Sequence, residues 1–150
     1  MLKIPYQIWN RLVADLRTRG QGERESGAFL LGAADVVSAY VCFDDLDPSA
    51  LSTGAITFHK EGFIKLWGLC AEKNLKVCAD VHTHPGPWAS QSWIDEANPM
   101  IDLKGHIAMI LPHYATFDHP TLEEVGIHEY LGKHRWKTIK PKSKKVVLTK

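Results

Sequence analysis

Two histidines at alternate positions, His82 and His84, constrain the fold of this chain more than any other feature. The largely apolar, β-prone run of residues 77–81 precedes them, and Pro85 follows at once, which predicts that the histidines lie where a strand ends. Alternate residues of a strand point to the same side, so both imidazoles can reach one ion while Thr83 points elsewhere. The sequence therefore predicts a strand that ends at a rim of the domain and carries two potential metal ligands there.

A short helix is predicted immediately after this strand. Residues 91–98 have helical character, with Ser90 as a candidate N-cap and Pro99 beyond the helix end. A spacing of three residues places Ser92 and Asp95 on one face of such a helix. On its own, this Ser-x-x-Asp sequence resembles a capping box, in which the serine serves only to start the helix.

Taken together, the strand end and the helix supply a set of zinc-type ligands. His82, His84 and Asp95 provide two nitrogens and one carboxylate within fourteen residues. Three protein ligands leave the fourth position of a tetrahedral zinc ion to water, which is typical of catalytic rather than structural sites. Zinc lowers the pKa of bound water from about 15.7 toward about 7, so the sequence predicts hydrolysis near neutral pH.

The pattern His-x-His-x(7)-Ser-x-x-Asp resembles the JAMM motif of the JAB/MPN metalloprotease family, which has this same spacing. That family places a glutamate upstream, in the pattern Glu-x-x-Gly-(apolar)3-Gly. When Gly32 is taken as the last glycine, the glutamate is Glu25, and Ala28 stands where the family often has glycine. Without the motif, Glu25 is typical of a solvated carboxylate, and Glu23 is the alternative if the register differs.

The resemblance implies a role for each of these residues. His82, His84 and Asp95 would hold one zinc ion with a bound water as its fourth ligand. Glu25 would take the proton of that water and later hand it to the departing amine. Ser92 would donate a hydrogen bond to the oxyanion of the tetrahedral intermediate.

The order of predicted elements also resembles a JAB/MPN domain, which implies an α/β (α+β), cytidine-deaminase-like fold with a mixed sheet flanked by helices. We expect one such domain at residues 1–139 and a basic C-terminal tail at residues 140–150. Helices are predicted from Pro5 to about Gly20 and within residues 57–74. Further strands are predicted at residues 27–32, 36–43, 106–111, 125–130 and 134–139, with a loop at residues 44–48.

Charge and cysteine content limit the classes of partner. Residues 137–150 contain six lysines and no acidic residue, so this end is predicted to be a solubilising, partly disordered segment. A docking arm for nucleic acid or an acidic partner is the alternative, and nucleic acid is not expected. Cys42, Cys70 and Cys78 are odd in number and have no paired spacing, which predicts reduced core residues. With no signal peptide core and no membrane-spanning run, the expected location is the cytoplasm.

Some other polar and aromatic residues leave alternatives open. Trp88 either walls a substrate groove or is an ordinary loop residue. Asp80 is a candidate partner for one of the histidines. His113, Asp118 and His119 form a weaker cluster, for which a surface loop is favoured over a second metal site.

The function implied by the resemblance is that of a zinc-dependent, deubiquitinase-like (iso)peptidase. It would hydrolyse the amide bond after the C-terminus of a ubiquitin-like protein, in a conjugation or antiviral pathway. The implied partners are that protein or its conjugate, with activating and conjugating enzymes of the same pathway and no membrane. The alternatives are a non-catalytic MPN scaffold, an enzyme that processes a sulfur-carrier protein, and a metallohydrolase for small amides.

Overall fold

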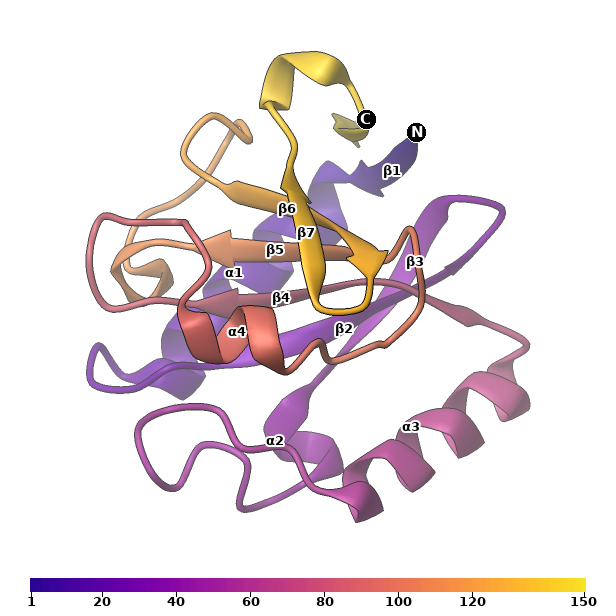
Figure 1. The fold of residues 1–150 in the computed structure, drawn as a ribbon, viewed down its shortest axis with the longest axis vertical. Coiled ribbons are helices and arrows are strands. Elements are labelled where there is room, and N and C mark those ends of the chain that lie inside the picture. The colour runs from indigo at the N-terminus through magenta and orange to yellow at the C-terminus, as the bar shows by residue number, and fades with distance from the viewer.

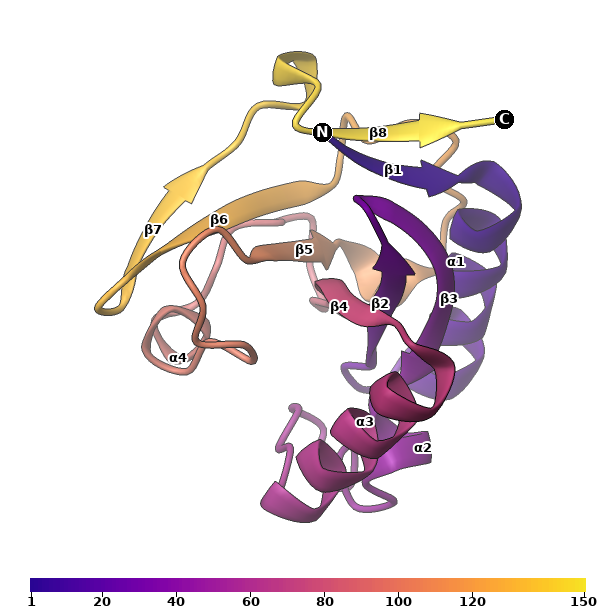
Figure 2. The ribbon, with the colours of Figure 1, turned by 90° about the vertical axis from the view of Figure 1, so that its right-hand side faces the viewer.

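One mixed sheet of eight strands organises the chain, and the computed structural model describes all residues, 1–150. The strand order is β7-β6-β5-β4-β2-β3-β1-β8, and Figures 1 and 2 show that the sheet is strongly curled. The strands are β1 (Leu2–Pro5), β2 (Gly27–Ala33), β3 (Val36–Cys42), β4 (Lys76–Thr83), β5 (Ile107–Leu111), β6 (Gly126–Gly132), β7 (Arg135–Thr138) and β8 (Val146–Thr149).

Helices cover both faces of the sheet. They are α1 (Tyr6–Gly20), α2 (Phe43–Leu46), α3 (Lys60–Lys73) and α4 (Trp93–Ala97), with short 3-10 turns η1 (His113–Ala115) and η2 (Pro141–Ser143). Figure 2 shows α1 on one side of the sheet and α3 and α4 on the other. The mixed sheet with flanking helices confirms the predicted fold class, and both long helices lie where the sequence predicts them.

The central strand β2 separates two apolar clusters because alternate residues point to opposite faces. Ala28 and Leu30 belong to the larger cluster, which packs against α1. Phe29 and Leu31 belong to the smaller one, under α2 and α3. All four are fully buried, and burial of such a leucine contributes about 1.5–3 kcal/mol, so the apolar run of β2 fits a strand covered on both faces.

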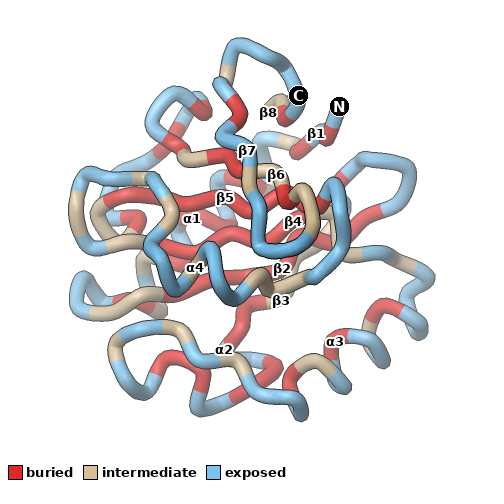
Figure 3. The backbone as a smooth tube through the Cα atoms, viewed as in Figure 1, coloured by how far each residue is buried: buried red, intermediate tan, exposed pale blue.

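The histidine strand β4 lies inside the sheet, antiparallel to β2 and parallel to β5. Because β4 and β5 are parallel, the loops that follow them meet at one edge. There the His84 N–H donates to the Leu111 carbonyl (2.9 Å), and the Tyr114 N–H donates to the His84 carbonyl (2.8 Å). Figure 3 shows β4 and β5 buried, whereas α4 in front of them is exposed. The core thus holds one half of the motif rigidly.

Two expectations about the ends and loops of the chain differ from the structure. The expected basic tail includes β8, which pairs in parallel with β1, a strand the sequence did not predict. Its apolar residues enter the sheet because residues 146–149 are mostly β-branched, while lysines flank them. Residues 44–48 were expected to be a loop, but the first three continue α2 from Phe43. No helix combines the length and the apolar character that crossing a membrane requires.

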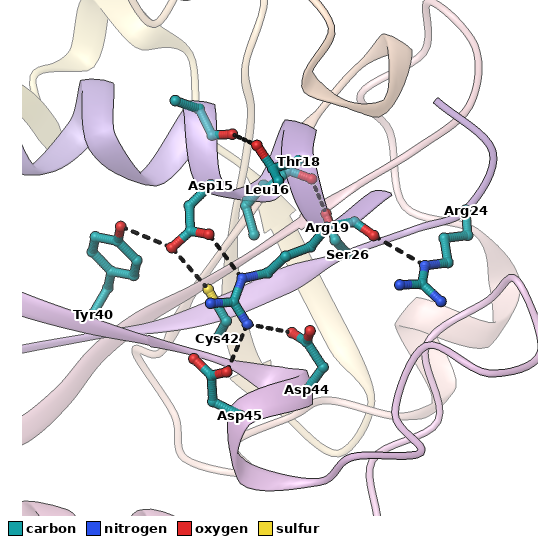
Figure 4. A network of polar contacts seen from close by, with 11 residues as sticks. Asp15, Leu16, Thr18, Arg19, Arg24, Ser26, Tyr40, Cys42, Asp44 and Asp45 are labelled. Atoms are coloured by element: carbon teal, nitrogen blue, oxygen red, sulfur yellow. Dashed lines mark hydrogen bonds and ion pairs between the residues drawn. The ribbon is translucent and has the colours of Figure 1, made fainter. Parts of the chain in front are cut away.

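A cluster of charged side chains, which we call the Arg19 cluster, ties α1 to α2 (Figure 4). Arg19 Nε lies 2.8 Å from Asp15 Oδ1, and its Nη1 lies 2.8 Å from Asp45 Oδ1 and 3.1 Å from Asp44 Oδ1. On its far side, Asp15 accepts a hydrogen bond from the Tyr40 hydroxyl at 3.1 Å. The cluster therefore contains a cation of its own.

Candidate metal centre

Three side chains converge beyond the end of β4, and they are the only group in the chain with the geometry of a metal site. His82 Nε2 lies 3.0 Å from His84 Nε2 and 3.4 Å from Asp95 Oδ1, and His84 Nε2 lies 3.1 Å from Asp95 Oδ2. Tetrahedral zinc with bonds of about 2.0–2.1 Å requires its ligand atoms to lie roughly 3.3 Å apart. The separations and the donor types both fit that ion. We call this group the metal-centre donors.

The backbone of β4 explains how the two histidines come together. Their rings lie 4.8 Å apart, and Thr83 between them points to the opposite face, as predicted. Thr83 is fully buried and exchanges two hydrogen bonds with Ser26: its Oγ1 accepts from the Ser26 N–H (3.0 Å), and its N–H donates to the Ser26 carbonyl (2.9 Å). This exchange fixes the strand end of β4 against the residue that follows Glu25.

Helix α4 begins at a capping box that also prepares the aspartate. Ser92, not Ser90, is the N-cap: its Oγ accepts from the Asp95 N–H (3.1 Å), and Asp95 Oδ2 accepts from the Ser92 N–H (2.9 Å). The same Oδ2 faces His84. Cap and ligand are therefore one arrangement, because the cap holds the carboxylate toward the histidines. The Ser92 hydroxyl hydrogen is left free to donate elsewhere.

Glu25 lines the same cleft as His82 and Asp95 of the metal-centre donors, whereas Glu23 is exposed and does not line it. The Glu25 N–H donates to the Gly54 carbonyl (2.8 Å), which holds the segment before β2. Burial raises the pKa of the Glu25 carboxyl, and the nearby His82 and His84 oppose that rise. The geometry favours Glu25 over Glu23 as the carboxylate of the site.

The protonation of the donors depends on their contact with one another. Burial would raise the pKa of Asp95, but hydrogen bonds from His82 and His84 outweigh it and hold that pKa well below its usual range. Burial would lower the pKa of His82, but the Asp95 carboxylate outweighs it and raises that pKa. A metal ion must therefore displace a proton here, so metal affinity should weaken as the pH falls.

The cleft has a volume of about 590 Å³. Its lining includes His82 and Asp95 of the metal-centre donors, together with Glu25 and Ser92. No lysine or arginine lines it, although Asp80 and Asp102 add two further carboxylates. The rest of its wall is largely apolar and aromatic and includes Phe43, Phe58, Phe63, Ile94, Met100 and Trp136. Such a cleft suits a chain with apolar side chains and a cationic group.

The secondary candidates have other positions. Asp80 accepts a hydrogen bond from the buried His106 (2.6 Å) and makes none with the metal-site histidines. Trp88 is 73% exposed and does not line the cleft. Asp80 was a candidate partner for one of the motif histidines, and this was wrong. Its partner, His106, lies immediately before β5, and the sequence alone does not show that β5 pairs with β4.

The weaker histidine cluster does not converge. The His113 ring packs on Phe117, with ring centroids 5.5 Å apart, while Asp118 forms an ion pair with Arg17 (2.7 Å). His119 is buried under α1, where its carbonyl accepts from the Trp9 indole (2.7 Å). These side chains serve packing in a loop and form no second metal group.

Comparison with known proteins gives the fold a name. No family model matches the chain. A solution structure from Desulfitobacterium hafniense is 15% identical over 100% of this chain and 94% of that one, with a TM-score of 0.68. A JAB1/MPN domain protein from Archaeoglobus fulgidus is 14% identical over 100% and 98%, with a TM-score of 0.55.

A third structure is described as JAMM, a metalloprotease-like zinc site in the proteasome and signalosome. It is 15% identical over 100% of this chain and 99% of that chain, with a TM-score of 0.51. These likenesses show that the chain has the JAB1/MPN fold. His82, His84 and Asp95 resemble the JAMM motif in both spacing and convergence.

Proposed function

We propose that this protein is a zinc-dependent isopeptidase that hydrolyses the amide bond after the C-terminus of a ubiquitin-like protein. One observation carries the proposal: His82 and Asp95 of the metal-centre donors line an open cleft together with Glu25. The JAB1/MPN fold of the chain, shared with a structure described as a metalloprotease-like zinc site, supports it.

The residues of the cleft have the properties that amide hydrolysis requires. When bound, zinc supplies a Lewis acid that lowers the pKa of water and polarises a carbonyl group. Glu25 takes a proton from the attacking water and passes it to the departing amine, and its raised pKa suits both transfers near neutral pH. Ser92 offers its free hydroxyl hydrogen to the oxyanion that forms on the carbonyl.

The charge and shape of the cleft support a protein tail as substrate. Its open, partly apolar wall accepts an extended chain, which a ubiquitin-like protein provides at its C-terminus. Its carboxylates, with no lysine or arginine among the lining residues, stabilise an amine such as a lysine side chain as the leaving group. A conjugate of such a protein, and the activating and conjugating enzymes that make it, are the partners this proposal implies.

The test uses ubiquitin-like proteins of the native host fused to a short peptide or joined to a lysine. We expect cleavage after the terminal glycine, its loss with a zinc chelator, its return with added zinc and no change on thiol alkylation. The metal mechanism fails if chelation spares activity while alkylation abolishes it. If the zinc protein cuts only small amides, a small-amide hydrolase replaces this proposal, and if it cuts nothing, a binding scaffold does.

A further inference from the structure

The segment that carries Ser92 and Asp95 is not held by the core. None of residues 84–105 is buried, and Figure 3 shows α4 and the loop before it as an exposed layer over buried strands. A five-residue helix without a buried side chain has little intrinsic stability. Other contacts must therefore keep Asp95 within reach of His82 and His84.

Within residues 85–98, three backbone carbonyls accept hydrogen bonds from donors in later parts of the chain. The His113 N–H donates to the Gly86 carbonyl (2.9 Å). His128 Nε2 lies 3.0 Å from the Ala89 carbonyl, and Trp136 Nε1 donates to the Glu96 carbonyl (3.0 Å). Of the three donors, two are side chains of the hairpin formed by β6 and β7. These two contacts lie on either side of Ser92 and Asp95 in the sequence.

The geometry of β6 is fitted to this contact. A Cβ atom at Gly126 would lie 1.8 Å from the Ala89 carbonyl oxygen, so only glycine permits so close an approach. Because a carbonyl can only accept, His128 must carry its hydrogen on Nε2, which leaves Nδ1 to accept from the Thr138 hydroxyl (3.4 Å). His128 is buried, with 4% of its surface exposed, so its ring has little freedom to turn away.

The second donor, Trp136, is also held in place by packing. The Trp136 ring packs on Tyr130, with centroids 4.9 Å apart, and Tyr130 is 1% exposed. The indole N–H therefore projects from the rigid sheet onto the end of α4. The two donors therefore hold an exposed segment in a fixed place relative to the sheet.

We infer that His128 and Trp136 are positioning residues, which hold the motif loop (residues 85–92) and α4 so that Asp95 completes the metal site. This inference rests on the proposed zinc site. It adds that the ligand geometry depends on the β6–β7 hairpin, which contributes no ligand itself.

The test compares zinc affinity, by competition with a chromophoric chelator, with hydrogen exchange of the amides of residues 92–98 in the zinc-free protein. His128→Phe removes the donor, whereas His128→Gln keeps an N–H at a similar distance from the backbone. We expect His128→Phe to weaken zinc binding about fivefold and to speed exchange by a similar factor, as loss of one hydrogen bond implies. His128→Gln should recover most of both, and Trp136→Phe should act like His128→Phe.

Arg135→Gln is the matched control, because this exposed side chain lies on the same hairpin, does not line the cleft and forms no hydrogen bond to residues 85–98. It should change neither measurement. If wild-type protein bound no zinc, the proposed function would fail. If wild type bound zinc but both His128→Phe and Trp136→Phe kept its affinity and exchange rates, the positioning role alone would fail. The positioning role also fails if His128→Phe does not fold and Trp136→Phe is unchanged.

Discussion

The Arg19 cluster and the metal-centre donors are both groups of polar side chains that join distant segments, but only one contains a permanent cation. In the Arg19 cluster, three carboxylates surround one guanidinium (Figure 4), and the hydrogen bonds that Arg19 donates to Asp45 and Asp15 outweigh burial and raise the pKa of Arg19 further. At the metal centre, Asp95 faces two imidazoles, and Glu25 adds a second carboxylate to the same cleft. No lysine or arginine balances them.

The difference indicates which cluster maintains structure and which performs chemistry. A group that supplies its own counter-ion is complete in the folded chain and has nothing to bind. A group of ligand atoms that lie at tetrahedral spacing without a permanent cation is complete only with an external ion. Substitutions in the first should therefore change stability, and substitutions in the second should change binding and turnover.

The largest expected effect belongs to Glu25→Gln. A neutral amide cannot accept a proton, so we expect turnover to fall by about 10²–10⁴-fold while zinc content stays the same. The zinc-free variant should be at least as stable as wild type at neutral pH, because burial, which raises the pKa of Glu25, disfavours its charged form. Turnover, zinc analysis and thermal unfolding measure the three quantities. Glu23→Gln is the control, and a larger loss there would reverse the assignment.

The next effect concerns the ion. His82→Ala, His84→Ala or Asp95→Ala each removes one of three protein ligands, so zinc affinity should fall by about 100-fold or more. Unfolding of zinc-free His84→Ala should change little, whereas Asp95→Ala also removes the carboxylate of the α4 capping box and should cost about 1 kcal/mol. Elemental analysis and chelator competition decide this, and full zinc occupancy in His84→Ala would remove His84 from the site.

How far the sequence predicts this molecule depends on the range of the interactions. The stripe of α1 and the histidine strand are local patterns, so their elements could be predicted. The convergence of ligands was also expected, because the spacing from His82 to Asp95 spans only one strand end and one helix start. The N-cap was misplaced, since Ser90 and Ser92 are both good caps and only the finished contacts distinguish them.

Long-range contacts could not be predicted in this way. β1 and β8 pair across nearly the whole chain, and a run of four residues carries no signal that identifies its partner. His128 and Trp136 act on residues about forty positions away, through a carbonyl that any residue could provide. The feature that marks this contact is the close approach of Gly126 to the Ala89 carbonyl, and only the folded structure shows it.

A smaller effect is expected at the Arg19 cluster. Arg19→Met leaves three carboxylates without their cation. These side chains are partly exposed, so the loss of unfolding free energy should lie between that of exposed and that of buried ion pairs, at about 2 kcal/mol. Zinc affinity should not change. The loss should shrink in high salt, and Arg11→Met, at an exposed position on the same helix, should cost much less. Denaturant unfolding with parallel zinc titration tests this, and a fall in zinc affinity would mean that the two clusters are coupled.

The smallest expected effect concerns the reactivity of Cys42, which tests whether the carboxylates of the Arg19 cluster balance the charge of Arg19. A thiol beside an arginine normally loses its proton readily and becomes nucleophilic. Here burial raises the pKa of Cys42, and Asp15, whose Oδ2 lies 3.7 Å from the sulfur, outweighs the opposing effect of Arg19. We therefore expect iodoacetamide at pH 8 to modify the partly exposed Cys78 first, to leave Cys42 intact in folded protein and to leave turnover unchanged. Mass spectrometry of time points locates the adducts. Rapid modification of Cys42 would show that Arg19 is not balanced by its carboxylates, and the contrast between a closed and an open cluster would then be wrong.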